Sequence, residues 1–498
     1  MKTLSSALDW WAKSQPDTPA LVCAGERLSF AEYDAWASRI AVYLHSLGVR
    51  PNDRVAVCAV NSLEYCALAM GAIRAGATVM PVSSRFTRHE AADILEDTTP
   101  VLVFADAEHA RVVENQGPAL HSLDEIVALR HGEPARLDLD LDPAWPVVII
   151  ATSGSTAKPK GVVFTHASMV DYATEFLMYE PTISNGARVL AIAPLSTSAG
   201  FVQLMHYPTL GCTLYLEPAF EPKSGLELLQ REQINSFGGV PLLFERIAAL
   251  PEFATADLTN LRLVTVGGAR VSRQLLDAWM VKGIVIRQIY GQTECGGFAT
   301  IMPAALAKDA PEKCGWGGPL TEVITARPDG ARCDAGEVGQ ILIRGPGRML
   351  GYWNNPKATA EAIQDGWLHT GDLGVLDERG LLTFVDRMKD IIISGGLNIS
   401  AAEVERAVGD YPGVEEVVVI AAPDPKFAET PMAVLYASGD IDVAALISHC
   451  NGRLADYKVP RYVVVEVEPL PRLATGKLSK PAIRQKYQDR VAELPRVR

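Results

Sequence analysis

The chain of 498 residues is long enough for two or more domains, and its 48% hydrophobic and 21% charged residues are typical of a globular protein. Its net charge of −13 argues against nucleic acid and anionic membranes as main partners. No apolar run reaches transmembrane length, and the first residues lack the apolar core of a signal peptide. The 8 cysteines form no C-x-x-C pair, so we expect neither a zinc site nor disulfides, and a reduced, cytoplasmic setting.

In the first hundred residues, apolar helices alternate with short apolar strands. The pattern predicts a helix from Phe30 to Leu47, a strand over 54–60, a helix over 63–75 and a strand over 78–81. Such alternation is typical of βαβ units, which build a parallel sheet. The stretch 117–142 is looser and charged, and we expect it to lie at the surface.

A run of small residues, hydroxyls and lysines, Thr152–Gly161, separates two strand-like segments, 147–150 and 162–164. Small residues let backbone N–H groups crowd around an anion, hydroxyls add donors, and lysines add charge. The run therefore predicts a clamp for a polyphosphate. It is not a Walker loop, because Pro159 stands in place of the second glycine and no helix follows. Taken alone, the run also fits a solvated turn between two strands.

Further strands are predicted after this loop, over 189–193, 264–268, 285–289, 339–345 and 382–385. The last two follow a shift, after Gly315, toward β-structure rich in glycine. A change of domain is expected at 386–390. Beyond it, the pattern predicts a helix over 401–408, strands over 414–420 and 432–436, a helix over 443–454 and a charged helix after Leu478.

The predicted architecture is an α/β fold with two domains. Residues 1–386 form a large N-terminal domain of sheets with alternating strands and helices, plus a β-rich subdomain. Residues 387–498 form a small, mobile α+β C-terminal domain.

Four further motifs follow the loop at 152–161 in a fixed order. They are Tyr290-Gly291-Gln292-Thr293-Glu294, Gly366-Trp367-Leu368-His369-Thr370-Gly371-Asp372, Asp386-Arg387-Met388-Lys389-Asp390 followed by Ser394-Gly395-Gly396, and Leu470-Pro471-Arg472-Leu473-Ala474-Thr475-Gly476-Lys477-Leu478. In this order and spacing, the set closely resembles the adenylate-forming acyl-CoA synthetases, a family shared with adenylation domains and firefly luciferase. The resemblance covers essentially the whole chain and implies ATP, Mg²⁺ and coenzyme A as cofactors.

The reaction of that family explains why such parts are needed. A carboxylate resists attack by a thiol, because its charge repels nucleophiles and oxide is a poor leaving group. Joining it to AMP creates a mixed anhydride with a good leaving group, and catalysis is then mainly positioning and electrostatic stabilisation. The resemblance thus implies an ATP-dependent carboxylic acid–CoA ligase that forms an acyl-adenylate and then a thioester, releasing AMP and pyrophosphate.

The resemblance also implies roles for individual residues in adenylation. The phosphate clamp corresponds to Thr152, Ser153, Gly154, Ser155, Thr156 and Lys160, and the contacts to the nucleoside to Gly268, Ala269, Tyr290, Gly291, Gln292, Asp372 and Arg387. Glu294 matches a Mg²⁺ ligand, Thr293 a phosphate donor, and Lys477 the lysine that contacts the carboxylate and α-phosphate oxygens. Each residue alone has an ordinary structural explanation, and their joint order favours function.

The second half-reaction is implied to use the same site after the C-terminal domain rotates. Lys389 matches the hinge position, where a few backbone changes swing the domain. Ser394, Gly395 and Gly396 then reach the active site, and the glycines let the pantetheine arm pass close to the backbone. Lys458 either contacts CoA phosphates or is an exposed charge, and both interpretations stay open.

The residues that match the family's substrate pocket are mostly small: Thr197, Ser198, Gly239, Gly267, Cys295 and Gly296. Many members have an aromatic residue and a histidine where Ser196 and Thr197 stand, so this pocket is either widened or altered by neutral drift. No Asp occurs between 194 and 207 to pair with an α-ammonium, which argues against an amino-acid substrate. We expect an uncharged hydrophobic acid: aryl, alicyclic or medium-chain fatty.

Three other residues lie near these motifs, and two of them have more than one interpretation. Ala157 stands in the clamp where the family usually has glycine, at a modest backbone cost. His206 is expected to be a core or pocket-wall histidine. Arg270 either meets a polar substituent of the substrate or, as we prefer, forms a surface ion pair.

Two other functions stay open from the sequence. One is a stand-alone adenylation enzyme that loads a carrier protein; the absence of an attached carrier domain after Lys477 neither proves nor excludes it. The other is a catalytically silent nucleotide-binding protein, against which the intact Glu294 and Asp372 argue. We expect a monomer or homodimer that acts on a small-molecule carboxylic acid and CoA, with no nucleic-acid partner and no membrane span.

Overall fold

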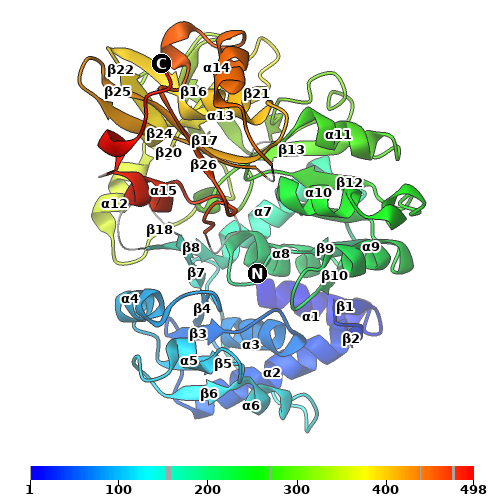
Figure 1. Ribbon diagram of the computed structural model, residues 1–498. Coiled ribbons are helices and arrows are strands. Elements are labelled where there is room, and N and C mark those ends of the chain that lie inside the picture. Colours follow the sequence, from blue (N-terminus) through cyan, green and yellow to red (C-terminus); the bar gives the residue numbers. More distant parts are fainter. Residues whose placement is uncertain (1, 153–158, 270, 438, 474–476, 489) are drawn as a thin grey trace. The chain divides into compact units, whose positions relative to one another are not determined.

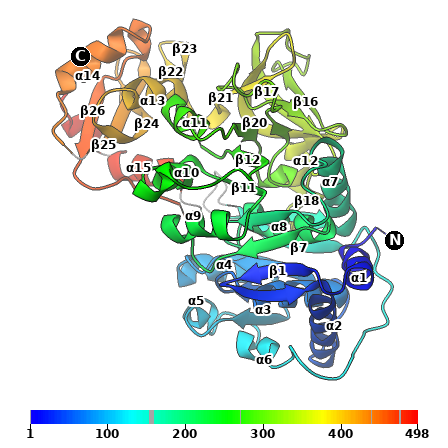
Figure 2. The same cartoon turned by 90° about the vertical axis from the view of Figure 1, so that its right-hand side faces the viewer.

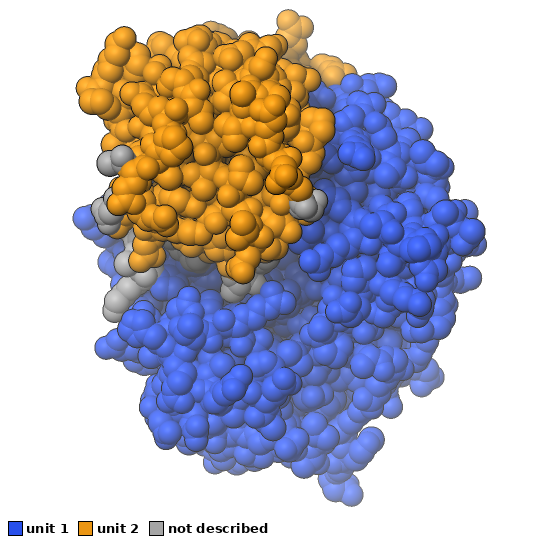
Figure 3. All heavy atoms as spheres, in the orientation of Figure 1, with its two compact units in different colours: residues 1–323, 342–369 blue, residues 324–341, 370–498 orange. Residues whose placement is uncertain are grey.

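The computed structural model describes residues 2–152, 159–269, 271–437, 439–473, 477–488 and 490–498 (Figure 1). The chain divides into two compact units: unit 1 comprises 1–323 and 342–369, and unit 2 comprises 324–341 and 370–498 (Figure 3). The chain passes from one unit to the other within β16 (Glu322–Ala326), β17 (Val338–Arg344) and β20 (Trp367–Leu376). The domain boundary at 386/387 and the mobility of the C-terminal domain stay predictions.

Unit 1 contains a seven-stranded sheet in the order β18-β8-β7-β4-β3-β5-β6. Its strands are β3 (Arg54–Cys58), β4 (Thr78–Val82), β5 (Leu102–Ala105), β6 (Leu120–Ser122), β7 (Pro146–Thr152), β8 (Lys160–Thr165) and β18 (Gly351–Tyr352). The strands β4, β3, β5 and β6 pair in parallel, whereas β7 and β8 form an antiparallel hairpin. The parallel pair β3–β4 confirms the predicted βαβ unit.

The helices around this sheet begin where the sequence offers caps. They are α2 (Phe30–Ser46), α3 (Leu63–Arg74), α4 (Arg88–Thr98), α5 (Ala110–Val113) and α6 (Leu123–Val127). Ser29 caps α2 and forms a reciprocal capping box with Glu32, which fixes the start of the helix one residue after the cap. The α2 and α3 helices pack on each other, as Figure 2 shows.

The stretch 117–142 is more ordered than the sequence suggested. It contains the parallel strand β6 and the helix α6, in which Leu123 and Ile126 are buried. The expectation of a loose surface segment was wrong for these residues, because two apolar side chains three positions apart suffice to dock one helical turn. The charged remainder after α6 has no regular secondary structure up to β7.

A second sheet of unit 1 has nine strands in the order β15-β14-β13-β12-β11-β9-β10-β1-β2. These strands are β1 (Pro19–Cys23), β2 (Glu26–Ser29), β9 (Arg188–Ala191), β10 (Thr213–Leu216), β11 (Ser236–Gly239), β12 (Leu263–Val266), β13 (Ile286–Tyr290), β14 (Thr300–Ile301) and β15 (Trp316–Gly317). The helices around it are α1 (Leu4–Ser14), α7 (His166–Tyr179), α8 (Ser198–Thr209), α9 (Pro222–Arg231), α10 (Pro241–Ala248) and α11 (Arg273–Met280), and α12 (Pro356–Ala362) follows β18. The core around Phe237, Phe244 and Trp279 joins the sheet to α9, α10 and α11.

Both sheets of unit 1 contain the same order of parallel strands. In the first, β3 has β4 on one side and β5 on the other; in the second, β9 has β10 on one side and β11 on the other. In each sheet, the second strand is added on one side of the first and the third strand on the other side. We call the boundary between β3 and β5, and that between β9 and β11, the reversal points of the two sheets. In open α/β sheets, the crevice at the carboxyl ends of strands around such a reversal is the usual ligand site.

Unit 2 is built around a five-stranded sheet in the order β23-β22-β25-β24, with β26 paired to β25. Its elements are β21 (Leu382–Arg387), β22 (Ile391–Ser394), β23 (Leu397–Ser400), α13 (Ala401–Gly409), β24 (Val414–Asp424), β25 (Ala428–Ala437), α14 (Val443–Asn451), β26 (Tyr462–Glu466) and α15 (Lys480–Tyr487). The strands β24 and β25 form one long hairpin, so both extend beyond their predicted ends. Apolar residues of α13 and α14 cover the sheet, with Val404 and Leu446 fully buried.

The α/β class with a large N-terminal and a smaller C-terminal part is confirmed. Within the described residues, no helix combines the length and apolar character that a membrane span requires.

Candidate functional site

Three predicted segments lie at one edge of the nine-stranded sheet. Gly239 ends β11, Gly267 follows β12, and Tyr290 ends β13, and these three strands are parallel neighbours. The N–H of Gly267 donates to the carbonyl of Gly239 at 3.1 Å. Because carboxyl ends of parallel strands meet at one edge, the segment 290–294 lies beside both glycines, with Gly268 and Ala269 exposed next to them.

The helix α8 joins this edge through two hydroxyls. Thr293 Oγ1 donates to Ser198 Oγ at 3.0 Å, which ties the first residue of α8 to the Tyr290–Glu294 motif. Thr197 caps the helix, since its hydroxyl accepts the N–H of Gly200. The structure thus brings the predicted pocket residues Thr197 and Ser198 to Thr293.

The turn after Tyr290 is tight and needs its glycines. A Cβ on Gly291 would overlap the carbonyl oxygen of Gly297, so no larger residue fits. Gly296 has φ +77°, a left-handed conformation that favours glycine. Cys295, a predicted pocket residue, is buried, and its thiol donates to the carbonyl of Gln292 at 3.1 Å.

Tyr352 connects the predicted metal ligand with the flank of the phosphate loop, and sequence reasoning missed it. Its hydroxyl donates to Glu294 Oε1 at 2.8 Å, and Lys160 Nζ lies 4.9 Å from the centre of its ring. Burial and the Glu294 carboxylate raise the pKa of this phenol. Thr152 Oγ1 donates to the carbonyl of Lys160 at 3.3 Å, which closes the base of the hairpin.

The central part of the predicted phosphate clamp lies outside the described residues. It comprises Ser153, Gly154, Ser155, Thr156, Ala157 and Lys158. Arg270 and Gly476 lie outside them too. The roles of these residues stay predictions.

Three predicted catalytic and ribose-binding residues lie together in unit 2. Asp372 on β20 stands opposite Arg387 on β21, and Arg387 Nε is 3.8 Å from Asp372 Oδ1. Asp372 is buried, with 7% of its surface exposed. Burial, with the charge of Arg387, lowers the pKa of Lys477, and Asp372 opposes this shift. Asp372, Arg387 and Lys477 thus form one charged group, since both neighbours act on the pKa of Lys477, and such perturbed groups cluster at functional sites.

The predicted hinge residue Lys389 stands in a short 3₁₀ turn, Met388–Asp390. The carboxylate of Asp390 is buried and held by α15: Arg484 lies at 2.6 Å and Lys480 at 3.9 Å. This turn is therefore attached to the helix that follows Lys477.

The Gly395–Gly396 pair forms the turn of the hairpin β22–β23. Both residues have positive φ, +57° and +83°, as a type I′ turn requires. The N–H of Gly395 donates to the carbonyl of Phe427, whose ring lies 4.6 Å from the Arg461 guanidinium and 5.0 Å from Lys426 Nζ. An aromatic face flanked by two cations thus lies beside the predicted pantetheine contact.

Lys458 is not the exposed charge that one interpretation assumed. Its ammonium lies 2.8 and 2.7 Å from the two carboxylate oxygens of Glu403. Only 20% of the side chain is exposed. Binding of CoA phosphates by Lys458 stays a prediction, and the phosphates would have to compete with the Glu403 carboxylate for its ammonium.

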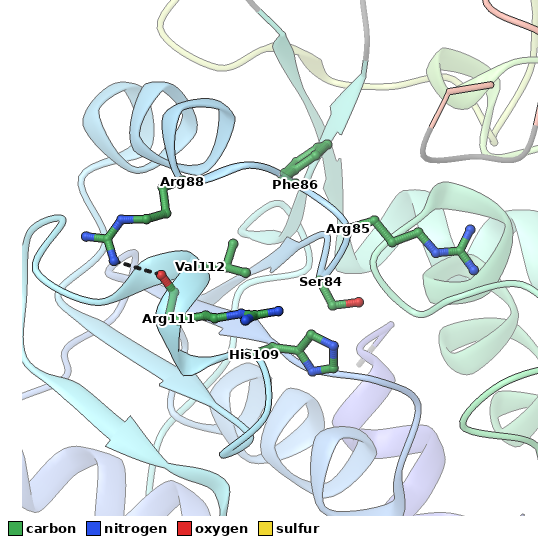
Figure 4. A pocket seen from close by; sticks show the side chains of 7 residues that line it. All are labelled: Ser84, Arg85, Phe86, Arg88, His109, Arg111 and Val112. Atoms are coloured by element: carbon green, nitrogen blue, oxygen red, sulfur yellow. Dashed lines mark hydrogen bonds between the residues drawn. The ribbon is translucent and has the colours of Figure 1, made fainter. Parts of the chain in front are cut away.

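A pocket of about 450 Å³ lies at the carboxyl ends of β4 and β5, beside the first reversal point (Figure 4). It is lined by Ser84, Arg85, Phe86, Arg88, His109, Arg111 and Val112. The Arg88 guanidinium donates to the carbonyls of Arg111 and Glu114, while His109 Nδ1 lies 2.7 Å from Asp106 Oδ1. Sequence reasoning missed this basic pocket, because its three arginines come from two separated segments.

Asn61 links the two sheets of unit 1 near their carboxyl ends. It follows β3, is 3% exposed, and donates its side-chain N–H groups to the carbonyls of Ala193 and Glu217. Its side-chain oxygen accepts the N–H of Leu195 at 2.7 Å. One buried amide thus orients the segment that leads into α8.

Comparison with known proteins agrees with these features. Residues 8–353 match the AMP-binding enzyme family, and residues 403–477 match the AMP-binding enzyme C-terminal domain. The feruloyl-CoA synthase of Amycolatopsis sp. is 35% identical over 482 residues, which cover 96% of this chain and 97% of the relative. The fatty acid–[acyl-carrier-protein] ligase ScoC of Streptomyces coeruleorubidus is 31% identical over 512 residues, which cover 98% and 97%.

A solved structure has the same fold over nearly the whole chain. The O-succinylbenzoate coenzyme A synthetase MenE of Bacillus subtilis, in complex with ATP and a magnesium ion, superposes with a TM-score of 0.87 at 28% identity. The match covers 97% of this chain and 99% of that chain.

Proposed function

The chain belongs to the family of AMP-binding enzymes, and from this premise we propose that it is an ATP-dependent carboxylic acid–CoA ligase. It first forms an acyl-adenylate and pyrophosphate, and then a thioester and AMP. The observation that carries the proposal is the charged group Asp372, Arg387 and Lys477, which combines a buried carboxylate with two cations at family-matched positions. The similarity to a coenzyme A synthetase bound to ATP and magnesium supports it.

In adenylation, a carboxylate oxygen of the acid attacks the α-phosphorus of ATP, and pyrophosphate leaves. Lys477 stabilises the negative charge that gathers on the α-phosphate oxygens, and Asp372 accepts hydrogen bonds from the ribose hydroxyls. Tyr290 packs on the adenine, and Thr152–Lys160 holds the β- and γ-phosphates. When the nucleotide binds, the Thr293 hydroxyl donates to a phosphate oxygen in place of Ser198 Oγ, and the Ser198 hydroxyl can then donate to Thr293 Oγ1.

The residues at Glu294 fit a magnesium ion that arrives with ATP. Among the described residues, no three His, Cys, Asp or Glu side chains cluster as a complete metal site. A single carboxylate plus phosphate oxygens and waters is, however, the set that Mg²⁺ prefers. Glu294 would hold the ion, which would neutralise phosphate charge, and the Tyr352 hydroxyl would orient the carboxylate.

We assign the phosphates of CoA to the basic pocket of unit 1. Arg85 and Arg111 line this pocket and are exposed, with the Arg85 side chain extending away from the other labelled residues (Figure 4), and arginine binds phosphates through paired N–H groups. In the thioester step, the CoA sulfur attacks the acyl carbon and AMP leaves. In unit 2, the Gly395–Gly396 turn lies beside the pantetheine arm, and Phe427 offers an aromatic face.

The substrate that fits best is an uncharged hydrophobic acid. Thr197, Ser198, Gly239 and Gly267 are small residues at the carboxyl ends of the strands, and no Asp stands between 194 and 207 to pair with an ammonium. The two relatives act, by their names, on an aryl acid and a fatty acid. The cellular compartment that fits this reaction is the cytoplasm, because CoA and ATP occur there and thiols stay reduced. The described cysteines are free thiols.

A carrier-protein ligase is the second candidate, because ScoC is similar over nearly its whole length. The basic pocket favours CoA, since a carrier-bound pantetheine lacks the nucleotide that would occupy it.

Pyrophosphate release with ATP, Mg²⁺ and a panel of acids tests the proposal. Acid-dependent release followed by thioester formation with CoA supports it; release without transfer to CoA favours a carrier, and no release with any acid contradicts both.

Arg111→Gln tests the assignment of the basic pocket. Loss of one charge-assisted contact should raise KM for CoA about tenfold and leave acid-dependent ATP–pyrophosphate exchange unchanged. Arg273→Gln, which removes an exposed arginine paired with Asp277, is the matched control and should leave both quantities unchanged. An unchanged KM for CoA in Arg111→Gln and in Arg85→Gln would contradict the assignment.

A further inference from the structure

His206 on α8 is a buried imidazole with an unused polar atom. It is 4% exposed, and its Nε2 has no hydrogen-bond partner among the residues that the structure describes. Burial lowers its pKa to about 3, so the ring is neutral at working pH. Buried polar groups are nearly always paired in native proteins, and an exception asks for an explanation such as an absent ligand.

The surroundings of His206 are aromatic. Its ring centre lies 4.7 Å from that of Phe176, 4.8 Å from that of Tyr207 and 5.5 Å from that of Tyr172. The Tyr172 hydroxyl is already engaged, since it donates to the carbonyl of Phe298 at 3.0 Å. Among the described residues of this aromatic cluster, His206 Nε2 is therefore the polar side-chain atom without a hydrogen-bond partner.

The position of His206 on α8 connects it to the proposed acid site. Ser198, Val202 and His206 recur every four residues, so they share one face of the helix. Ser198 bonds to Thr293 at one end of this face, and Phe298, from the same segment as Thr293, packs with Tyr172 near the other end. Eight helical residues span about 12 Å, which is the length scale of an aryl or medium-chain acid.

We propose that His206 is a specificity residue that hydrogen-bonds a hydroxyl group at the far end of the hydrophobic acid. This inference rests on the proposed function and names its substrate class more closely. A hydroxyl both donates and accepts, so it complements Nε2 in either neutral tautomer. The aromatic rings around His206 would contact the apolar body of the same acid. A site built for a hydroxyl rejects the analogue that lacks it, because its own polar group then stays unpaired.

The test compares matched acids with and without one distal hydroxyl, on aryl and alkyl chains of increasing length, through kcat/KM for pyrophosphate release. The wild-type enzyme should prefer the hydroxylated member of at least one pair by about tenfold or more. In His206→Phe, kcat/KM for that acid should fall about tenfold, and kcat/KM for its partner should stay within about twofold. Tyr207→Phe, which removes the neighbouring hydroxyl, should retain the preference.

Stability gives a second readout. Because Nε2 has no partner in the described structure, His206→Phe should keep or raise the Tm of the protein without substrate. A lower Tm together with an equal loss of kcat/KM for both acids would show a structural role and overturn the inference. Equal kcat/KM of the wild type for both acids of every pair would also overturn it, with the ligase function intact. Absence of pyrophosphate release with any acid would instead reject the proposed function.

Discussion

Lys477 carries a charge that its surroundings disfavour. Burial and the nearby Arg387 lower the pKa of its ammonium below 10.5, and Asp372 offsets this in part. In the role proposed for Lys477, the ammonium must be present to stabilise the α-phosphate in adenylation. A lowered pKa means that the proton leaves at a lower pH than in an ordinary lysine, so the activity that depends on it falls sooner as pH rises.

The pH profile of kcat/KM for ATP–pyrophosphate exchange reports the pKa values of essential groups in the free enzyme. Because the pKa of Lys477 is lowered, we expect the alkaline limb of this profile, where activity falls as pH rises, to lie below pH 10.5. Arg387→Gln removes a like charge and should move the limb to higher pH, even though the weaker ribose contact lowers the rate. Arg379→Gln, which alters an exposed pair with Asp377, is the control and should leave the limb in place.

Lys477→Ala has no ammonium and should show no exchange at any pH, while still transferring the acyl group from a supplied adenylate to CoA. A limb that stays fixed in Arg387→Gln, or equal loss of both half-reactions in Lys477→Ala, would contradict the role of Lys477 in adenylation.

At the residue scale, sequence motifs led to Glu294, Asp372 and Lys477 but not to their supporting contacts. Tyr352 bonds to Glu294 across 58 residues, and no motif marks it. Asn61 and His206 are single polar residues in apolar segments. No motif marks Asn61, and His206 was expected only to be a core or pocket-wall histidine. The importance of these two residues depends on which groups from distant parts of the chain surround them. The spacing of apolar residues in the sequence does not predict such contacts.

Among the elements, the hairpin β22–β23 contains two glycines that are needed for the turn and also leave open space beside it. Positive φ at Gly395 and Gly396 is needed for the turn, whatever passes beside it. No atom lies within 4 Å of a Cβ built on Gly396, so added bulk there would meet open space in which CoA is proposed to pass.

Gly396→Leu should slow thioester formation by about a hundredfold, or roughly 2.7 kcal/mol of barrier, and leave ATP–pyrophosphate exchange within about twofold. Gly396→Ala introduces a similar backbone strain at positive φ with little bulk, so it is the matched control and should retain most of the activity. Single-turnover transfer from acyl-adenylate to CoA measures the effect. Equal losses in both variants would assign the effect to strain and not to blocked passage.

The elements themselves could be predicted where the apolar pattern is regular. The alternation over 30–81 led to α2, β3, α3 and β4 within two residues at most ends. The hairpin β24–β25 is longer than predicted, because cross-strand pairing extends it past the apolar residues. The helix α6 was missed because one docked turn leaves a weak signal.

At the scale of the whole molecule, the order of strands determines where the proposed ligand sites lie. Both sheets of unit 1 reverse at a central strand, and each reversal presents a different chemistry: small residues at β9/β11 and arginines near β3/β5. The first is the proposed site of the uncharged acid, and the second is the proposed site of the CoA phosphates. Alternating helices and strands predicted parallel sheets, but the order of strands within a sheet depends on pairing between distant segments. The sequence alone therefore could not predict that the arginines of the basic pocket lie together.

The central claim is that this one chain carries out both half-reactions through a bound acyl-adenylate. A single-turnover experiment tests it most directly: excess enzyme is mixed with ATP, Mg²⁺ and an acid from the panel that supports pyrophosphate release, quenched, and analysed for acyl-adenylate and acyl-CoA. Without CoA, the acyl-adenylate should accumulate to nearly one equivalent of the limiting reactant. On addition of CoA, it should disappear at the rate at which acyl-CoA and AMP appear. Acyl-CoA formed without a detectable adenylate, or an adenylate that CoA leaves untouched, would contradict the claim.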